Sequence, residues 1–261
     1  MNIITLTTDW GLKDYYIGAV KGKIYSLMPQ VNVVDISHQI QSFDIEEASY
    51  VLKNSFPYFP EKTIHILGIN SIASADTPHV LIGFKNHYFI CADNGIMALV
   101  IGDENPDFII DIDFPQDTDT YNFPEKDLFV KIAAHIYNGL SLDELGDPKN
   151  SLNTLLINNE PNLKPNNING KVSHIDAYSN IITNITKTDF KNIQKGRKFE
   201  ITVFPGFSIN QLKTSYLDVE DNSLVAFFND NDLLEIGINK GHLASLMSVR
   251  IGSFINIEFF T

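Results

Sequence analysis

Apolar residues in the first half of the chain follow two alternating patterns. Residues 2–8 (NIITLTT) are β-branched and apolar, as in a strand buried on both faces. Between residues 16 and 28, apolar positions recur at steps of three and four before Pro29, which predicts a helix. These patterns recur downstream and predict strands at 31–37, 63–69, 79–84, 87–92 and 107–112, and helices at 44–57, 95–101 and 128–136. Such alternation predicts an α/β domain whose mostly parallel sheet is flanked by helices, with strands 79–84 and 87–92 paired around a turn at Lys85 and Asn86.

The pattern changes at residues 158–170 (NNEPNLKPNNING), which are rich in Asn and Pro and poor in large apolar residues. This composition is typical of a linker or a long surface loop. Beyond it, short β-rich runs separated by turn residues continue to the C-terminus, which predicts a small antiparallel β-barrel or sandwich. We therefore expect two domains, at 1–160 and 168–261, with the boundary between about Asn158 and Asn169.

Composition and charge argue against several classes of binding partner and site. The formal net charge is −13 and the lysines are scattered among acidic residues, so we expect no nucleic-acid partner. Cys91 is the single cysteine, and the seven histidines lack HxH or HExxH spacing, so we expect neither disulfides nor a metal site. The sequence has no signal-peptide pattern and no apolar stretch of membrane-spanning length, which predicts a cytoplasmic protein without a membrane partner.

Polar residues follow several of the predicted strands, where open α/β sheets bind ligands. They are Asp9, Asp35, His38, Asn70, Asp93 and Asn94. Any one of them is better explained as a helix cap or turn former, but several together favour a binding site. The nucleotide-binding motifs GxGxxG and the P-loop are absent, as is the GxSxG motif of hydrolases.

Six motifs occur in a fixed order: TLTTDWGLKDYYIGAVKG, VVDISHQIQSFDIEEASYVL, ADNGIM, FPEKDLFVKIAAHI, GKVSHIDAYSNIITNI and LLEIGINKG. Together they resemble the S-adenosylmethionine (SAM) hydroxide adenosyltransferases and the related fluorinase and chlorinase. The resemblance implies an N-terminal α/β domain and a C-terminal β-barrel. It also implies a homotrimer in which SAM, as substrate or ligand and without a further cofactor, lies between the N-domain of one subunit and the C-domain of its neighbour.

The family reaction is displacement at the ribose C5′ of SAM, with methionine as the leaving group. Water gives adenosine, and halide gives a 5′-halo-adenosine. The hydrolases hold water with an Asp, an Arg and a His, whose positions correspond here to Asn70, Thr77 and Pro124. These three side chains cannot deprotonate water at neutral pH, although Asn70 could orient it by hydrogen bonding.

Glu125 follows Pro124 at a position where the family has a small residue. A carboxylate directed into the site would repel a halide, which argues against halogenation. Glu125 could replace the lost base, but we favour its interpretation as an ordinary first-turn glutamate, stabilised by the helix dipole. The candidate catalytic residues are therefore Asn70 and Glu125.

By resemblance, this chain retains more of the family's nucleoside-binding residues than of its water-binding residues. Asp9 would bind the ribose hydroxyls, Phe43 and Phe123 would line the ribose and adenine region, and Asp176 and Asn180 would bind the two ends of methionine.

Three segments that contribute to the pocket have diverged. YSN replaces FGN, NDND replaces NSxG and GHL replaces GNA, and these segments bring Asp230, Asn231 and Leu243 into the candidate pocket. Asp230 adds negative charge near the methionine carboxylate, which disfavours intact SAM more than adenosine.

Two main functions stay open from the sequence. One is a divergent SAM hydrolase with an altered water site. The other is a catalytically silent trimer that binds adenosine or SAM as a sensor or scaffold. The lost triad favours the second, the family's reaction class favours the first, and a trimer kept for structural reasons alone is a third possibility.

Overall fold

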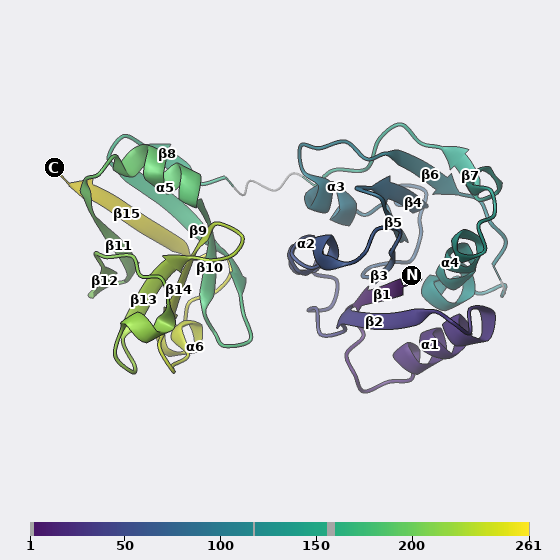
Figure 1. Cartoon of the computed structure of the whole chain (residues 1–261), viewed down its shortest axis with the longest axis horizontal. Helices are drawn as coiled ribbons and strands as arrows, with labels where there is room; N and C mark the ends of the chain where they lie inside the picture. Colours follow the sequence, from purple (N-terminus) through teal and green to yellow (C-terminus); the bar gives the residue numbers. More distant parts are fainter. Residues whose placement is uncertain (1–2, 117, 156–159, 261) are drawn as a thin grey trace. The chain divides into compact units, whose positions relative to one another are not determined.

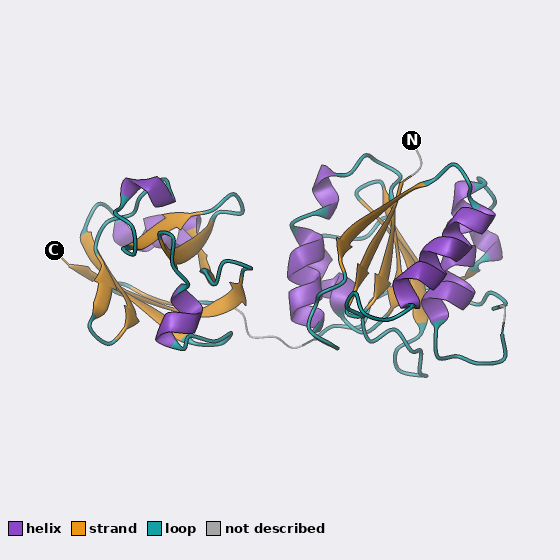
Figure 2. Ribbon diagram, turned by 90° about the horizontal axis from the view of Figure 1, so that it is seen from below, coloured by secondary structure: helices purple, strands orange, loops and turns teal. Residues whose placement is uncertain are grey.

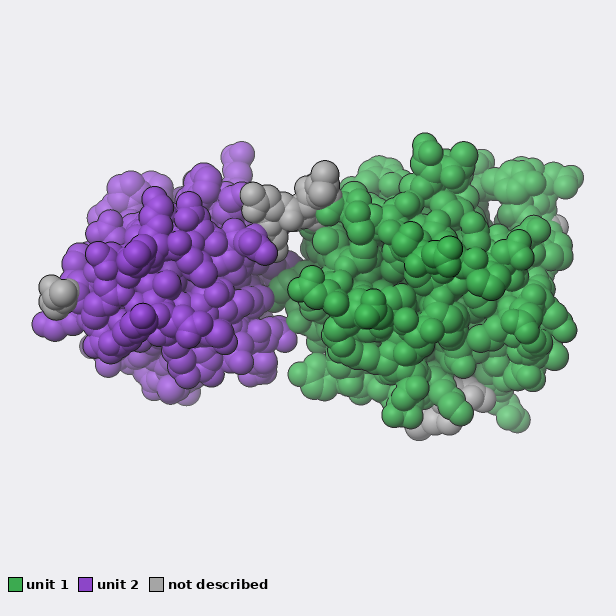
Figure 3. All heavy atoms as spheres, turned by 90° about the horizontal axis from the view of Figure 1, so that it is seen from above, with its two compact units in different colours: residues 1–156 green, residues 157–261 purple. Residues whose placement is uncertain are grey.

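The computed structural model describes residues 3–116, 118–155 and 160–260, and the chain forms two compact units, residues 1–156 and 157–261 (Figures 1 and 3). The domain boundary predicted from Asn158 onward begins within residues 156–159, which lie outside the described residues. In the described ranges, no helix has both the length and the apolar character needed to cross a bilayer.

The first unit is built on a seven-stranded sheet in the order β2-β1-β3-β5-β4-β6-β7. Its strands are β1 (Ile3–Thr8), β2 (Asn32–Ser37), β3 (Ile64–Gly68), β4 (His79–Phe84), β5 (His87–Ala92), β6 (Phe108–Ile112) and β7 (Gly146–Pro148). The pairs from β2 to β5 are parallel, whereas β4, β6 and β7 pair antiparallel. The sheet is therefore mixed, and the prediction of a mostly parallel sheet was overstated.

The two-residue turn between β4 and β5 explains this difference. Lys85 and Asn86 both have positive φ, 50° and 61°, as in a tight hairpin turn, so the chain reverses directly into its neighbour. Parallel neighbours need a long crossover connection, which this turn does not provide. The local pairing was predicted correctly, but its effect on the sheet as a whole was not.

Helices cover both faces of this sheet (Figure 2). They are α1 (Tyr16–Leu27), α2 (Ile45–Lys53), η1 (Phe56–Tyr58), α3 (Ile96–Ile101), the π-helical turn η2 (Glu125–Phe129), α4 (Val130–Tyr137) and η3 (Leu142–Glu144). α1 and α4 contribute to one hydrophobic cluster, and α2 and α3 to the other. In β3, Ile66 belongs to the first cluster and Leu67 to the second, so the strand is buried on both faces as its sequence predicted.

The second unit is an antiparallel sheet that closes almost into a barrel, in the order β12-β11-β15-β9-β10-β14-β13, with β8 paired to β9. Its strands are β8 (Asn162–Lys164), β9 (Asn167–Ile175), β10 (Ile181–Thr186), β11 (Lys198–Phe204), β12 (Phe207–Ile209), β13 (Leu224–Phe228), β14 (Leu233–Ile238) and β15 (Phe254–Phe260). Beyond β12, the backbone N–H of Lys213 donates to the Ala226 carbonyl of β13 at 2.9 Å, which brings the two sheet edges together. The helices of this unit are α5 (Lys187–Gln194), η4 (Tyr216–Asp218) and α6 (Leu243–Met247).

β8 and the start of β9 occupy the stretch that the composition assigned to a linker. All three residues of β8 are exposed, so the segment lacks the apolar alternation that marks a half-buried strand. Its strand conformation comes from backbone pairing with residues 167–169 of β9. The linker interpretation of this part is therefore wrong.

Candidate functional site

Asp9 and Phe43, both predicted to line the pocket, lie together at the carboxyl end of β1. The backbone N–H of Phe43 donates to Asp9 Oδ2 at 2.8 Å. Phe43 has a left-handed φ of 67° and its side chain is 71% exposed. The hydrogen bond therefore holds an exposed phenyl ring beside the Asp9 carboxylate, whose other oxygen makes no hydrogen bond within the described part of the chain.

An aromatic cluster lies next to Asp9. The Trp10 and Phe123 rings meet edge to face with centroids 5.4 Å apart, and Tyr16 approaches Phe123 in the same way at 5.3 Å. Trp10 also stacks on the His38 ring at 6.5 Å. Phe123 thus packs against two rings, Trp10 and Tyr16, that the sequence analysis had not assigned to the site.

His38 in turn is fixed by polar neighbours on both sides. Its Nδ1 lies 2.7 Å from the Thr8 hydroxyl and its Nε2 lies 3.2 Å from Asp35 Oδ1. The hydrogen bond at Nδ1 restrains the imidazole, whereas the contact of Nε2 with Asp35 is close without having hydrogen-bond geometry. Asp35 and His38, both predicted to lie at strand ends, therefore contact each other, and Trp10 stacks on the His38 ring.

Glu125 occupies the first turn of η2, yet its side chain is buried rather than directed to solvent, with only 2% of the residue exposed. Among the described residues, Oε1 has no hydrogen-bond partner. Burial raises the pKa of this carboxyl from 4.5 to about 7; the negative charge of Asp9 adds to the rise and a hydrogen bond from the Ser71 side chain opposes it. Glu125 thus differs from the ordinary surface glutamate that the sequence analysis favoured.

Gly68, the last residue of β3, provides the space for this arrangement. A Cβ atom at residue 68 would lie 2.7 Å from Trp10 Cζ2 and 2.8 Å from Glu125 Oε1, both shorter than real contacts. The contacts described so far join one group of residues, which we call the strand-end site: Asp9, Trp10, Phe43, Ser71, Phe123 and Glu125.

The three positions that replace the family triad have different surroundings. Asn70 is exposed at the end of β3, with a left-handed φ of 43°. Thr77 closes a tight turn in which its hydroxyl lies 2.8 Å from that of Ser74. Pro124 is buried and begins η2. Of the three, only Asn70 presents a free polar group next to the strand-end site.

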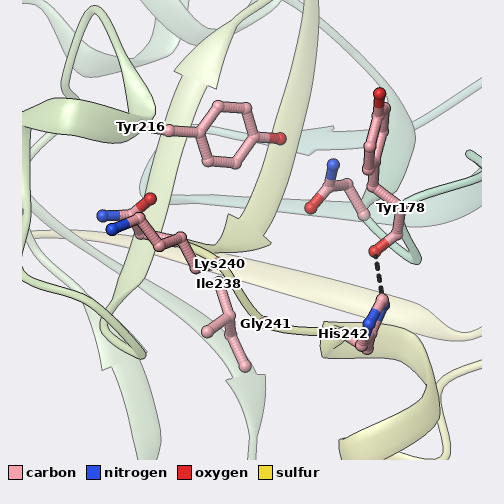
Figure 4. A pocket seen from close by; sticks show the side chains of 8 residues that line it. Tyr178, Tyr216, Ile238, Lys240, Gly241 and His242 are labelled. Carbon is pink, nitrogen blue, oxygen red and sulfur yellow. Dashed lines mark hydrogen bonds between the residues drawn. The ribbon is translucent and has the colours of Figure 1, made fainter.

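The second unit has a pocket of about 390 Å³, which we call the barrel pocket. Figure 4 shows the residues that line it: Tyr178, Asn180, Tyr216, Ile238, Asn239, Lys240, Gly241 and His242. His242 Nδ1 lies 3.2 Å from the Tyr178 carbonyl, which links α6 to the loop after β9. The Tyr216 hydroxyl donates to Glu235 at 2.6 Å, and burial followed by this contact raises the pKa of the phenol. The pocket therefore combines two tyrosine rings with amide and imidazole groups.

Asn180 lines this pocket and Asp176 does not, although the two residues are hydrogen-bonded to each other. Its Oδ1 accepts from the backbone N–H groups of Tyr178 and Asn180 at 2.9 and 2.8 Å. Its Oδ2 accepts from the Asn180 side chain at 2.9 Å. Asp176 thus orients Asn180, which lines the pocket in its place.

The remaining predicted residues are not brought to this pocket. Asp230 and Asn231 are exposed in the turn before β14, at the end of that strand opposite the pocket residue Ile238. Leu243 is fully buried in the barrel core. Across the described ranges, no group of three or more His, Cys, Asp or Glu residues could hold a metal ion.

Sequence reasoning missed several residues of these sites. Trp10 follows Asp9 directly and could have been included by position alone. Ser71 gave no signal, because its position depends on how the loop after β3 folds. Tyr216 lies in η4, between β12 and β13 in the chain, outside any motif.

Comparison with known proteins shows the same two-part organisation. The family model of the SAM hydroxide adenosyltransferase N-terminal domain matches residues 4–146, and that of the C-terminal domain matches residues 170–256. An (R)-S-adenosyl-L-methionine hydrolase of Methanocaldococcus jannaschii is 28% identical over 95% of this chain and 93% of its own. A fluorinase of Nocardia brasiliensis is 23% identical over 98% and 96% of the two chains. A crystal structure of an uncharacterized conserved protein from Thermotoga maritima superposes with a TM-score of 0.86, at 25% identity over 98% of this chain and 99% of that one.

The burial of Glu125 predicts a pH-dependent stability. Because its pKa is near 7 in the native state and 4.5 ordinarily, the native state retains a proton that the unfolded state has lost, and stability falls as pH rises between these values. Glu125→Gln removes this loss. The variant should unfold like the wild type at pH 4 and be more stable at pH 8, by on the order of a few kcal/mol. Urea unfolding across this range measures the difference, and a difference that does not change with pH would contradict the burial of an ionisable carboxyl.

Proposed function

Because the chain belongs to the SAM hydroxide adenosyltransferase family, we propose that it is a divergent SAM hydrolase that transfers the adenosyl group to water. One observation carries the proposal: the buried carboxyl of Glu125, whose Oε1 lacks a hydrogen-bond partner among the described residues, lies beside Asp9 and the loop that carries Asn70. An anion that is desolvated and titrates near neutral pH is suited to accept a proton from water. It offers a replacement for the acid–base groups that Asn70, Thr77 and Pro124 lack.

The proposed step needs one base and one leaving group. The water oxygen forms a bond to the ribose C5′ while the bond from C5′ to sulfur breaks, and the electron pair stays on sulfur in neutral methionine. The proton of the water passes to the Glu125 carboxylate, which gives adenosine and a protonated Glu125. Because the sulfonium is already an activated leaving group, the protein supplies mainly alignment and desolvation, and no further cofactor.

Other residues of the strand-end site receive roles that fit their geometry. Asp9 keeps one carboxylate oxygen free and would accept from the ribose hydroxyls. Phe43 and Phe123 would form the apolar wall for the nucleoside, and the Asn70 amide would orient the attacking water. Trp10 would border the site next to Glu125, because both side chains pack against Gly68.

The barrel pocket would contribute through Asn180 rather than through Asp176. The Asp176 carboxylate accepts three hydrogen bonds within its own loop and does not line the pocket, whereas Asn180 does. The roles that the sequence gave to Asp230, Asn231 and Leu243 have no such geometric support.

A catalytically silent SAM- or adenosine-binding protein is the second candidate. This candidate is favoured by Thr77, which closes a turn, and by Pro124, which immediately precedes η2. Neither side chain can act as an acid or a base near neutral pH. The two candidates differ only in whether Glu125 acts as a base, so a test of Glu125 separates them.

The first prediction concerns turnover. Incubation with SAM should give adenosine and methionine, detected by chromatography, and kcat/KM should rise with pH to a plateau above about 7, because the base acts only when ionised. Glu125→Gln should lower kcat at least about a hundredfold. Glu46→Gln is the matched control, because Glu46 is an exposed glutamate in the first turn of α2 and should have no effect. Absence of product would support the silent protein, and full activity of Glu125→Gln would remove Glu125 from the mechanism.

The second prediction concerns the nucleoside. Asp9→Ala leaves the Phe43 N–H without its acceptor and removes the oxygen proposed for the ribose. Adenosine should bind more weakly by about 1–3 kcal/mol, measured by calorimetry. Asp103→Ala changes an exposed aspartate beyond α3 and should leave the affinity unchanged. Equal affinity of Asp9→Ala and the wild type would reduce Asp9 to a turn former.

We also propose a homotrimer, in line with the family resemblance. Several large side chains of the first unit are strongly exposed, among them Leu12 at 68%, Tyr15 at 71% and Tyr121 at 69%. Clusters of exposed apolar side chains commonly mark protein interfaces. Light scattering at micromolar concentration should report three chains, and a monomer would contradict this assembly.

A further inference from the structure

His38, the first residue after β2, holds both ends of the loop that follows β1. Because β1 and β2 are parallel neighbours, their carboxyl ends lie side by side, which brings His38 next to Thr8, the last residue of β1. His38 Nδ1 lies 2.7 Å from the Thr8 hydroxyl, and the His38 carbonyl accepts from the backbone N–H of Gly11 at 2.7 Å. Gly11 has a left-handed φ of 67°, where this loop turns. The two residues between these contacts, Asp9 and Trp10, therefore form a short arc that is fixed at each end.

The arc is also held along its length by the loop after β2. The His38 ring stacks on the Trp10 ring, with centroids 6.5 Å apart and an interplanar angle of 14°. Phe43, further along the same loop, donates its backbone N–H to Asp9 Oδ2 at 2.8 Å. The loop after β2 thus contacts both residues of the arc as well as its two ends.

The orientation of the His38 ring follows from its other neighbours. Its Nε2 lies 3.2 Å from Asp35 Oδ1, and Lys21 Nζ donates to the other oxygen of Asp35 at 2.6 Å. Because a carboxylate only accepts hydrogen bonds, Asp35 favours the tautomer with its proton on Nε2, and Nδ1 then accepts from the Thr8 hydroxyl. Only 4% of His38 is exposed, so the residue acts on a ligand through the residues that it holds.

We propose that His38 is a positioning residue for the nucleoside part of the strand-end site, directing the Asp9 carboxylate and placing the Trp10 ring where it packs against Gly68. The inference rests on the proposed function for the role of Asp9 toward the ribose. Hydrogen bonds weaken steeply when their direction is wrong, and a loop that is ordered before binding loses less conformational entropy when the ligand arrives. His38 would therefore contribute to nucleoside affinity without touching the nucleoside.

Calorimetry with adenosine on the full-length protein tests this role. His38→Ala should weaken adenosine binding about tenfold, because a hydrogen bond and a ring contact that order the loop are lost. His38→Asn, whose side-chain oxygen can still accept from the Thr8 hydroxyl, should recover part of this affinity. His135→Ala is the matched control and should leave the affinity unchanged. His135 is likewise buried, hydrogen-bonds the Ser141 carbonyl at 2.6 Å and contacts an aromatic ring, but its contacts lie outside the strand-end site.

Trp10 is the single tryptophan of the chain, so its fluorescence reports on this loop without any ligand. Loss of the stacked imidazole in His38→Ala should shift the emission to longer wavelength and increase quenching by acrylamide. His135→Ala should give the wild-type spectrum even where it lowers the urea midpoint. If His38→Ala does not fold, Thr8→Val takes its place, because it removes only the buried hydroxyl that bonds His38. An affinity and a spectrum equal to those of the wild type would then overturn the inference.

A double-mutant cycle with Asp9→Ala separates positioning from a general loss of stability. If His38 acts through Asp9, His38→Ala should weaken adenosine binding far less in the Asp9→Ala background. Equal losses in both backgrounds would contradict the inference, as would an unchanged affinity or Trp10 spectrum in folded His38→Ala. Absence of adenosine binding in the wild type would overturn it together with the role of Asp9. Absence of SAM hydrolysis alone would overturn only the hydrolase proposal, because adenosine binding needs no turnover.

Discussion

The absence of a side chain at Gly68 is the constraint on which the strand-end site depends. Two large groups from distant parts of the chain, the Trp10 ring and the Glu125 carboxyl, occupy the space beside the last residue of β3. Any Cβ there would collide with both. This packing also removes Glu125 from water, and burial is the main cause of its raised pKa. The ionisation behaviour of the site therefore originates in a packing detail of the central strand.

The sequence predicted those features that depend on neighbours along the chain. The apolar pattern of β1, the hairpin turn at Lys85 and Asn86, and the helix that begins after Asp44 are local signals, and the structure has all three. The strand β8 was not predicted, because its residues are exposed and its strand conformation comes from pairing with β9. The mixed character of the sheet likewise follows from how strands are arranged in space.

The same distinction between local and spatial features applies to the candidate site. Position at a strand end indicated Asp9 and the family resemblance indicated Phe43 and Phe123; in the structure Phe43 contacts Asp9, and Phe123 contacts Trp10. Neither position nor resemblance could distinguish Asp9, of which one oxygen makes no hydrogen bond within the described residues, from Asp176, whose two oxygens both accept from its own loop. Nor could they show that Glu125 is buried, because its burial depends on Gly68 and Trp10, which are remote in sequence. Whether a carboxylate binds, orients or titrates is decided by its surroundings.

Binding of a charged ligand beside the buried carboxyl would be coupled to proton exchange at Glu125. Near neutral pH, Glu125 carries a proton for part of the time. A sulfonium bound beside it would favour the ionised form and expel that fraction of a proton to the buffer, whereas a neutral nucleoside would expel none. The affinity of the strand-end site for a cationic ligand would therefore rise with pH, whereas its affinity for an uncharged nucleoside would not change with the ionisation of Glu125.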